Sequence, residues 1–181
     1  MKKKIILLLM TIMALAVIGC GEGENTKAEN STDAATQQEE YIKFPEFQSS
    51  TINGDYIDSS IFAEADVTMV NIWGTFCGPC INEMPDLAEL YTELPTGCAL
   101  VGILTDVYGE ENLDLAVQIV SDTGVTYDNI IPDDSLYQFL TANITGVPTT
   151  LYVDSEGNIL GGVVGARSKE EYKAILEELV K

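Results

Sequence analysis

Eight residues near the middle of the chain, 73–80, read WGTFCGPC. The two cysteines of this stretch, Cys77 and Cys80, lie where an apolar run ends and a helical pattern begins. At a helix start, this spacing puts both side chains on one face, near the Cα separation of about 5.5 Å that a disulfide requires. The unpaired N–H groups of the first turn stabilise a thiolate. We therefore expect a redox-active pair: Cys77, nearer the helix end, is the more exposed nucleophile, with a pKa below the free value of about 8.5, and Cys80 resolves the mixed disulfide.

Two other uses of the cysteine pair stay open, a static disulfide and half of a zinc site. Zinc would need two further ligands, but the chain has no His and Cys98 falls inside an expected strand. A pair placed between a strand and a helix is the setting that a redox motif requires, so we favour redox chemistry. Gly78 lets a partner chain approach closely, and Pro79 fits the first turn, where its missing N–H costs little.

The residues on either side predict alternating strands and helices. Residues 67–73 and 98–104 are apolar runs typical of strands buried on both faces, and residues 78–94 have helical periodicity with Pro85 inside it. Further elements are expected as a hairpin over 47–57 with a type I′ turn at Asn53-Gly54, strands over 147–153 and 159–164, a short helix over 59–65, and helices over 112–123, 133–142 and 168–180. This order indicates an α/β sandwich.

Three helix details are also predicted. Asp133 or Asp134 caps the helix over 133–142, and Ser168 with Glu171 forms a capping box at the last helix. The apolar face of the helix over 112–123 is expected to consist of Leu113, Ala116, Val117 and Val120.

The composition excludes several classes of function. The 181 residues include 29 acidic and 9 basic side chains, for a net charge of −20, and no His. Without a basic surface, nucleic-acid binding is not expected. Without His, there is no Ser-His-Asp or Cys-His catalysis, no His-ligated metal and no haem held by its own His.

The first residues predict an export signal. Three lysines precede an apolar run over 5–18, which is shorter than the roughly 20 residues of a membrane span and fits a secretory signal. The run ends in Val17-Ile18-Gly19-Cys20, which resembles a bacterial lipobox. Residues 1–19 are then a lipoprotein signal peptide and Cys20 is lipidated, holding the protein to the membrane outside the cytoplasm. A plain signal peptide and an uncleaved anchor are the alternatives.

The next segment predicts a tether rather than a folded part. Residues 21–40 are acidic and polar, without an aromatic residue, Leu, Ile or Val, so they bury too little apolar surface to fold. With Cys20 they form a disordered acidic linker, and the folded domain is expected over 41–181.

Two motifs together carry a resemblance to a family. The stretch WGTFCGPC, with residues 146–150 (GVPTT) ahead of a strand ending in Asp154, resembles the thioredoxin superfamily. Residues 80–85, CINEMP, narrow this to the TlpA/ResA-like extracytoplasmic thioredoxins, over about residues 44–181. The resemblance implies a thioredoxin-like α/β/α sandwich with a central mixed sheet and an N-terminal β-hairpin extension.

The resemblance also implies roles for single residues. Pro148 would be a cis-proline beside the disulfide, with the Val147 backbone facing a client peptide that adds briefly as a strand; an ordinary strand-start proline is the alternative. Glu83 would lie near the sulfurs, tune their pKa and shuttle a proton, or else be a solvated helix acid. Trp73 would be a wall of the client-binding surface, or else part of the core.

The chain departs from ordinary thioredoxins at two positions. Asn71 stands where those proteins bury a proton-accepting Asp, and because Asn does not titrate, that role passes to Glu83 or to water. Phe76 replaces a Trp before the first cysteine and changes the contact surface. Cys98 is left over, and we expect a buried small residue at a strand start; a regulatory or intermolecular disulfide is the alternative.

These expectations combine into a membrane-tethered thiol–disulfide oxidoreductase, monomeric and without a cofactor beyond its own dithiol. CGPC resembles reducing thioredoxins, so we favour reduction of disulfides in envelope proteins. The implied clients include apocytochrome c, methionine sulfoxide reductases and peroxidases, and the implied electron donor is a membrane protein of the CcdA/DsbD type. A disulfide-forming oxidase stays open, because the direction depends on the reduction potential.

Two other classes of function are weaker. A thiol peroxidase would want Thr-x-x-Cys with an Arg close by, but Thr75 has the wrong spacing and Arg167 is far along the chain. A non-catalytic solute-binding lipoprotein usually needs a longer chain.

Overall fold

The computed structural model describes residues 42–108 and 110–181. The expected signal peptide over 1–19, the lipidated Cys20 and the linker over 21–40 lie outside these described residues. Within the described ranges, no helix is both long and apolar enough to cross a bilayer.

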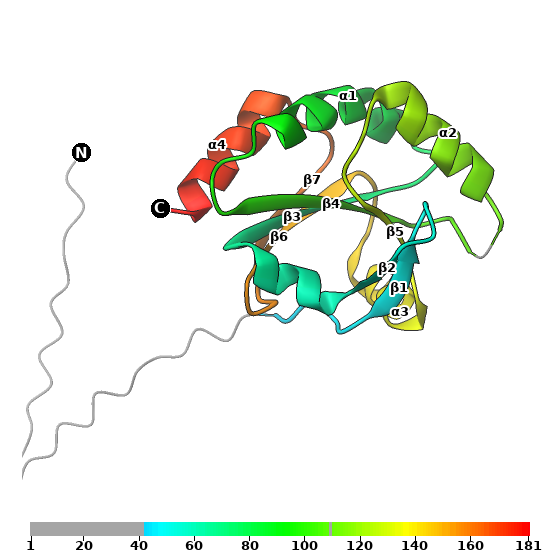
Figure 1. Cartoon of the computed structure of the whole chain (residues 1–181), viewed down its shortest axis with the longest axis horizontal. Helices are drawn as coiled ribbons and strands as arrows, with labels where there is room; N and C mark the ends of the chain where they lie inside the picture. Colours follow the sequence, from blue (N-terminus) through cyan, green and yellow to red (C-terminus); the bar gives the residue numbers. More distant parts are fainter. Residues whose placement is uncertain (1–41, 109) are drawn as a thin grey trace, which may run out of the picture. The chain divides into compact units, whose positions relative to one another are not determined.

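The described chain forms the expected α/β/α sandwich around one mixed sheet (Figure 1). The sheet has seven strands in the order β2-β1-β5-β4-β3-β6-β7. Strands β3, β4 and β5 are parallel, and the other pairings are antiparallel. The strands are β1 (Gln48–Thr51), β2 (Tyr56–Asp58), β3 (Val67–Trp73), β4 (Cys98–Leu104), β5 (Asn129–Ile131), β6 (Thr149–Asp154) and β7 (Ile159–Val164). The helices are the 3₁₀ helix η1 (Ser59–Glu64), α1 (Gly78–Thr92), α2 (Leu113–Thr123), α3 (Asp134–Asn143) and α4 (Lys169–Leu179).

Helices cover both faces of the sheet, and side-chain alternation along β3 builds a core under each. Helices α1, α2 and α4 lie on one face and α3 on the other (Figure 1). Met69 and Trp73 of β3 join the core under α1, α2 and α4, whereas Val70 and Ile72 join the opposite core with α3. All seven residues of β3 are buried, as its apolar run predicted. Since Asn71 shares the parity of Met69 and Trp73, it faces α1.

The helix starts follow the predicted capping residues. Asp133, not Asp134, caps α3, with its Oδ1 accepting from Leu136 N at 2.8 Å. The capping box of Ser168 and Glu171 is present at α4. Pro85 lies inside α1, as the helical periodicity of residues 78–94 predicted.

Two local predictions were wrong. The hairpin turn is not type I′, because among Asn53 and Gly54 only Gly54 has a positive φ; Thr51 N donates to Asp55 O at 2.9 Å, which closes a three-residue loop with a left-handed glycine. On α2, Val117 is exposed and Ile119 is buried, because the core lies along the side of the helix that carries Ala116 and Ile119.

One strand was missed, and one strand boundary differs. Strand β5 was not anticipated, since three residues leave too short a pattern to detect. Strand β6 starts at Thr149 rather than residue 147, because Pro148 has no N–H to offer a neighbouring strand.

Candidate active site

The two cysteines of the CGPC stretch are joined in a disulfide at the start of α1. Cys77 is the N-cap residue and Cys80 lies in the first turn, with their Cα atoms 5.3 Å apart. Cys77 Sγ accepts a hydrogen bond from Cys80 N at 3.2 Å. Both residues are buried, but Cys77 is 5% exposed and Cys80 1%, so Cys77 is the more exposed of the two, as predicted. Among the described residues, no group of three or more Cys, Asp or Glu side chains is placed to hold a metal ion.

The surface beside the disulfide is formed by the residues next to Cys77 and by the loop before β6. Phe76 is 72% exposed, and Gly78 and Pro79 are exposed too. The Val147–Pro148 peptide bond is cis, as the family resemblance implied. Val147 packs against the buried cluster that contains both cysteines. Segments about 70 residues apart in the chain therefore meet at one surface.

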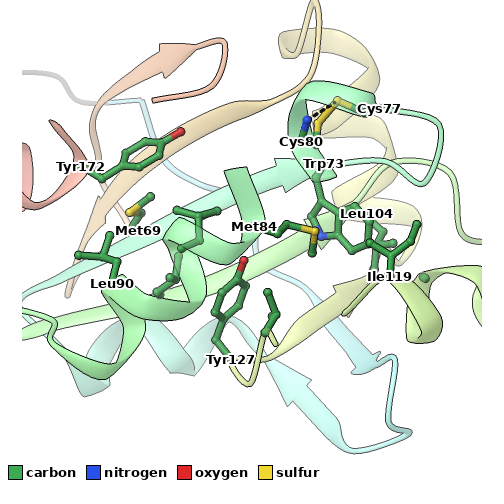
Figure 2. Packing of buried hydrophobic residues seen from close by; sticks show 14 of the residues in the cluster. Met69, Trp73, Cys77, Cys80, Met84, Leu90, Leu104, Ile119, Tyr127 and Tyr172 are labelled. Carbon is green, nitrogen blue, oxygen red and sulfur yellow. Dashed lines mark hydrogen bonds between the residues drawn. A yellow bond between two sulfur atoms is a disulfide. The ribbon is translucent and has the colours of Figure 1, made fainter. Parts of the chain in front are cut away.

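Trp73 belongs to the core and not to the client-facing surface. It is 0% exposed, and Figure 2 shows it beneath the disulfide, next to Met84. Its Nε1 donates to Asn129 Oδ1 at 2.9 Å, and Asn129 Nδ2 donates to Tyr127 O at 2.9 Å. The expected wall of the binding surface was wrong, because β3 turns this side chain inward and Asn129 satisfies its only polar group.

Glu83 is a buried carboxylate rather than a solvated helix acid. It is 4% exposed and lies three residues after Cys80, so both share one face of α1. Its Oε1 accepts from Asn71 Nδ2 at 3.0 Å, and its Oε2 accepts from Tyr172 OH at 3.0 Å and from Arg167 N at 3.2 Å. Burial raises the pKa of Glu83, although these hydrogen bonds oppose the rise.

The side chains around Glu83 come from three separate elements. Asn71 is on β3, Thr150 on β6 and Tyr172 on α4, and Thr150 Oγ1 lies 3.3 Å from both Asn71 Nδ2 and Tyr172 OH. Burial, with the nearby Glu83 carboxylate, raises the pKa of Tyr152 to about 12 and that of Tyr172 further. The tyrosines therefore stay protonated, and the carboxylate of Glu83 is the proton acceptor of this network.

Sequence reasoning missed three contributors to the site. Tyr172 and Arg167 contact Glu83 across more than 80 residues of sequence, and no local pattern marks them. Asp106 accepts from Thr75 N at 3.0 Å. That contact had a signal, because Thr75 and Asp106 follow the neighbouring parallel strands β3 and β4, whose carboxyl ends share one edge.

Cys98 is partly exposed, so the expected full burial was wrong. It is a free thiol at the first residue of β4, where the strand emerges from a turn. Burial and the nearby Asp66 carboxylate raise the pKa of this thiol, which keeps it protonated and weakly nucleophilic.

The chain is similar to known redox proteins over most of its length. Residues 42–161 match the AhpC/TSA family model. The thiol-disulfide oxidoreductase ResA of Geobacillus thermodenitrificans is 32% identical over 142 residues, which cover 75% of each chain. The thioredoxin-like protein YneN of Bacillus subtilis is 29% identical, over 74% of this chain and 76% of that protein.

Solved structures support the same fold. A thiol:disulfide interchange protein of the thioredoxin family from Chlorobium tepidum aligns with a TM-score of 0.68 at 26% identity, over 80% of this chain and 99% of that one. StoA from Bacillus subtilis aligns with a TM-score of 0.60 at 22% identity, over 75% and 96% of the two chains.

Proposed function

Because the chain belongs to the AhpC/TSA family and is a thiol–disulfide oxidoreductase of the ResA type, we propose that it reduces disulfides of client proteins outside the cytoplasm. The observation that supports this proposal most directly is the Cys77–Cys80 pair at a helix start, one turn from the buried Glu83. The proposed site also includes Pro148 and Val147, which face the client, with Phe76, Gly78 and Pro79 at the surface.

The first step of the proposed reaction is attack by the reduced enzyme. The Cys77 thiolate, stabilised by the first turn of α1, attacks one sulfur of the client disulfide. A Cys77–client S–S bond forms, the client S–S bond breaks, and the other client sulfur leaves as a thiolate that takes up a proton.

The second step releases the client. Cys80 gives its proton to the Glu83 carboxylate and attacks Cys77 Sγ, so the Cys77–Cys80 bond forms and the second client sulfur departs. That sulfur takes up a proton, so the client has gained two electrons and two protons. Asn71 does not titrate, and its hydrogen bond orients Glu83 for this role.

The proposal includes a location and an electron source. Lipidation of Cys20 would tether the enzyme to the membrane through the linker over 21–40. A membrane dithiol protein of the CcdA/DsbD type would return two electrons to the Cys77–Cys80 disulfide after each cycle. Apocytochrome c, methionine sulfoxide reductases and peroxidases remain candidate clients.

Insulin disulfide reduction by dithiothreitol tests the chemistry. We expect the whole chain to accelerate it, Cys77→Ser to abolish the acceleration without unfolding the protein, and Cys98→Ser, the matched control, to keep it. Cys80→Ser should accumulate a mixed disulfide at Cys77. Activity that survives Cys77→Ser would refute the mechanism.

The direction of electron flow needs its own measurement. We expect the reduction potential, measured by equilibration with glutathione, to be close to that of reducing thioredoxins, about −270 mV, and a value near −120 mV would favour the oxidase. Turnover of hydrogen peroxide without a thiol partner would favour the peroxidase. Against it, the hydroxyl of Thr75, the threonine nearest Cys77 in the sequence, donates its hydrogen bond to Asp106 Oδ2.

A further inference from the structure

An apolar groove of about 390 Å³ opens beside the cysteine pair. We name it the aromatic groove, and the residues that matter here are Phe76, Tyr108, Tyr137, Leu140, Ile144 and Val147. They come from the loops after β3 and β4, from α3 and from the loop before β6. None of them takes part in the sulfur chemistry described above.

Two residues that line the groove are sequence neighbours of the residues at the reacting sulfurs. Phe76 directly precedes Cys77, and Val147 directly precedes Pro148. An extended client segment advances about 3.3 Å per residue. When a client cysteine is bonded to Cys77, side chains one to three residues away therefore fall at the groove.

The walls of the groove include aromatic rings that the described residues leave exposed. Phe76 is 72% exposed, Tyr108 45% and Tyr137 46%. The two tyrosine rings meet edge to face with centroids 5.4 Å apart, and Tyr108 OH donates to Thr105 O at 2.7 Å, so the pair is held in place. A fixed aromatic surface of this kind suits a large apolar side chain.

The segments that line the groove carry no positive charge. From residue 44 to residue 166 the chain contains no Lys, Arg or His, so every segment that lines the groove lacks a cation. Asp133 and Asp134 line a second small hollow that shares Tyr108 and Tyr137 with the groove, and Asp134 is exposed. Such a surface attracts a cationic partner and repels an acidic one.

We propose that the aromatic groove is a client-docking site for a basic polypeptide, which inserts a large apolar or aromatic side chain near its disulfide. A neighbouring Lys or Arg of the client then lies by Asp133 and Asp134. This inference rests on the proposed function, since it names the client class of the same site. A second copy of this chain is disfavoured as the occupant, because its net charge of −20 opposes contact with an acidic surface.

The test uses the whole chain, reduced beforehand and freed of reductant, in single-turnover reactions with disulfide-closed peptides. Three peptides differ only beside one cysteine, where they carry Lys-Phe, Lys-Ala or Glu-Phe. We expect the Lys-Phe peptide to react roughly tenfold faster than Lys-Ala. We expect it to react about threefold faster than Glu-Phe at low salt, with this second preference lost at 1 M salt.

Variants assign the two preferences to named residues. Tyr137→Ala should bring the ratio of Lys-Phe to Lys-Ala rates towards one, and Asp134→Asn should reduce the ratio of Lys-Phe to Glu-Phe rates. The matched controls are Tyr56→Ala, an exposed tyrosine on β2, and Glu177→Gln, an exposed acid on α4; both ratios should persist in these variants. If Tyr137→Ala does not fold, the three peptides with the unmodified chain still decide.

A neutral small disulfide, bis(2-hydroxyethyl) disulfide, separates the two proposals. If it is reduced but the three peptides react equally, or Glu-Phe reacts fastest, the docking inference is wrong and the proposed function stands. If neither it nor any peptide is reduced, the proposed function itself fails. A dimer of the unmodified chain that Tyr137→Ala dissociates would assign the groove to a second copy and overturn the inference.

Discussion

Replacing Gly102 of β4 by alanine should destabilise the fold, because a Cβ atom there meets the hydrogen bond beneath the disulfide. The added atom would overlap Asn129 Oδ1 and lie 2.9 Å from Asn129 Cγ and 3.2 Å from Trp73 Nε1. The overlap and both of these distances are shorter than the 3.4 Å at which ordinary van der Waals contact begins. Asn129 is 1% exposed and also donates to Tyr127 O, so it has little room to move.

The size of the effect follows from what Asn129 must give up. Moving its Oδ1 breaks the 2.9 Å bond from Trp73 Nε1 and leaves a buried donor unpaired. That costs about 1–3 kcal/mol, and overpacking a filled core adds a similar amount, about 1–3 kcal/mol. Alanine also lowers the backbone entropy of the unfolded chain, which offsets about 0.5–1 kcal/mol of this loss of stability. We expect a net loss of about 2–4 kcal/mol in the free energy of unfolding.

Urea denaturation followed by tryptophan fluorescence measures this loss. Trp73 is the only tryptophan of the chain, so the signal reports from the perturbed position itself. With a denaturant slope of about 2 kcal/mol per M, the midpoint should fall by about 1–2 M. Gly161→Ala on β7 is the matched control, since no heavy atom beyond its two chain neighbours lies within 4 Å of the added Cβ.

Two outcomes would refute the reasoning. One is a Gly102→Ala variant as stable as Gly161→Ala. The other is strict additivity with Asn129→Ala, because removing the Asn129 side chain makes room for the new atom and should recover part of the loss.

Three further predictions concern the buried carboxylate and the last helix. Because burial raises the pKa of Glu83 above its ordinary value of 4.5, its contribution to stability is complete below pH 4.5 and is lost as pH rises through the folded-state pKa; Glu83→Gln should therefore make the unfolding free energy fall less steeply above pH 4.5, and an unchanged pH profile would contradict this. Tyr172→Phe removes a hydrogen bond to Glu83 and should cost about 1–2 kcal/mol of unfolding free energy in urea denaturation, and an unchanged stability would contradict this. Ser168→Ala removes the capping box with Glu171 and should cost about 1 kcal/mol, whereas loss of less than a few tenths would show that the box contributes little.

Local patterns were sufficient for most elements of the fold. The apolar runs of β3 and β4, the position of Cys77 at a helix start and the capping box at Ser168 each depend on residues within one turn or one strand. The hairpin turn failed at a finer level, because an Asn-Gly pair fits more than one loop and only the strand register selects among them. Strand β5 was not predicted, because its three residues form a strand through pairing with β4 and β1 and not through a sequence pattern of their own.

The sequence by itself determined the chemistry of this protein: two sulfurs one helical turn apart at the carboxyl end of a buried strand, since both their spacing and their place on α1 are local properties. Only the tertiary structure decided the surroundings of that pair. It buried Trp73 under Asn129, closed Asn71 and Tyr172 around Glu83, and opened the aromatic groove beside Phe76. These contacts join segments far apart in the chain, so they depend on how the sheet orders its strands and on which face each helix covers, and no nearby residue encodes them.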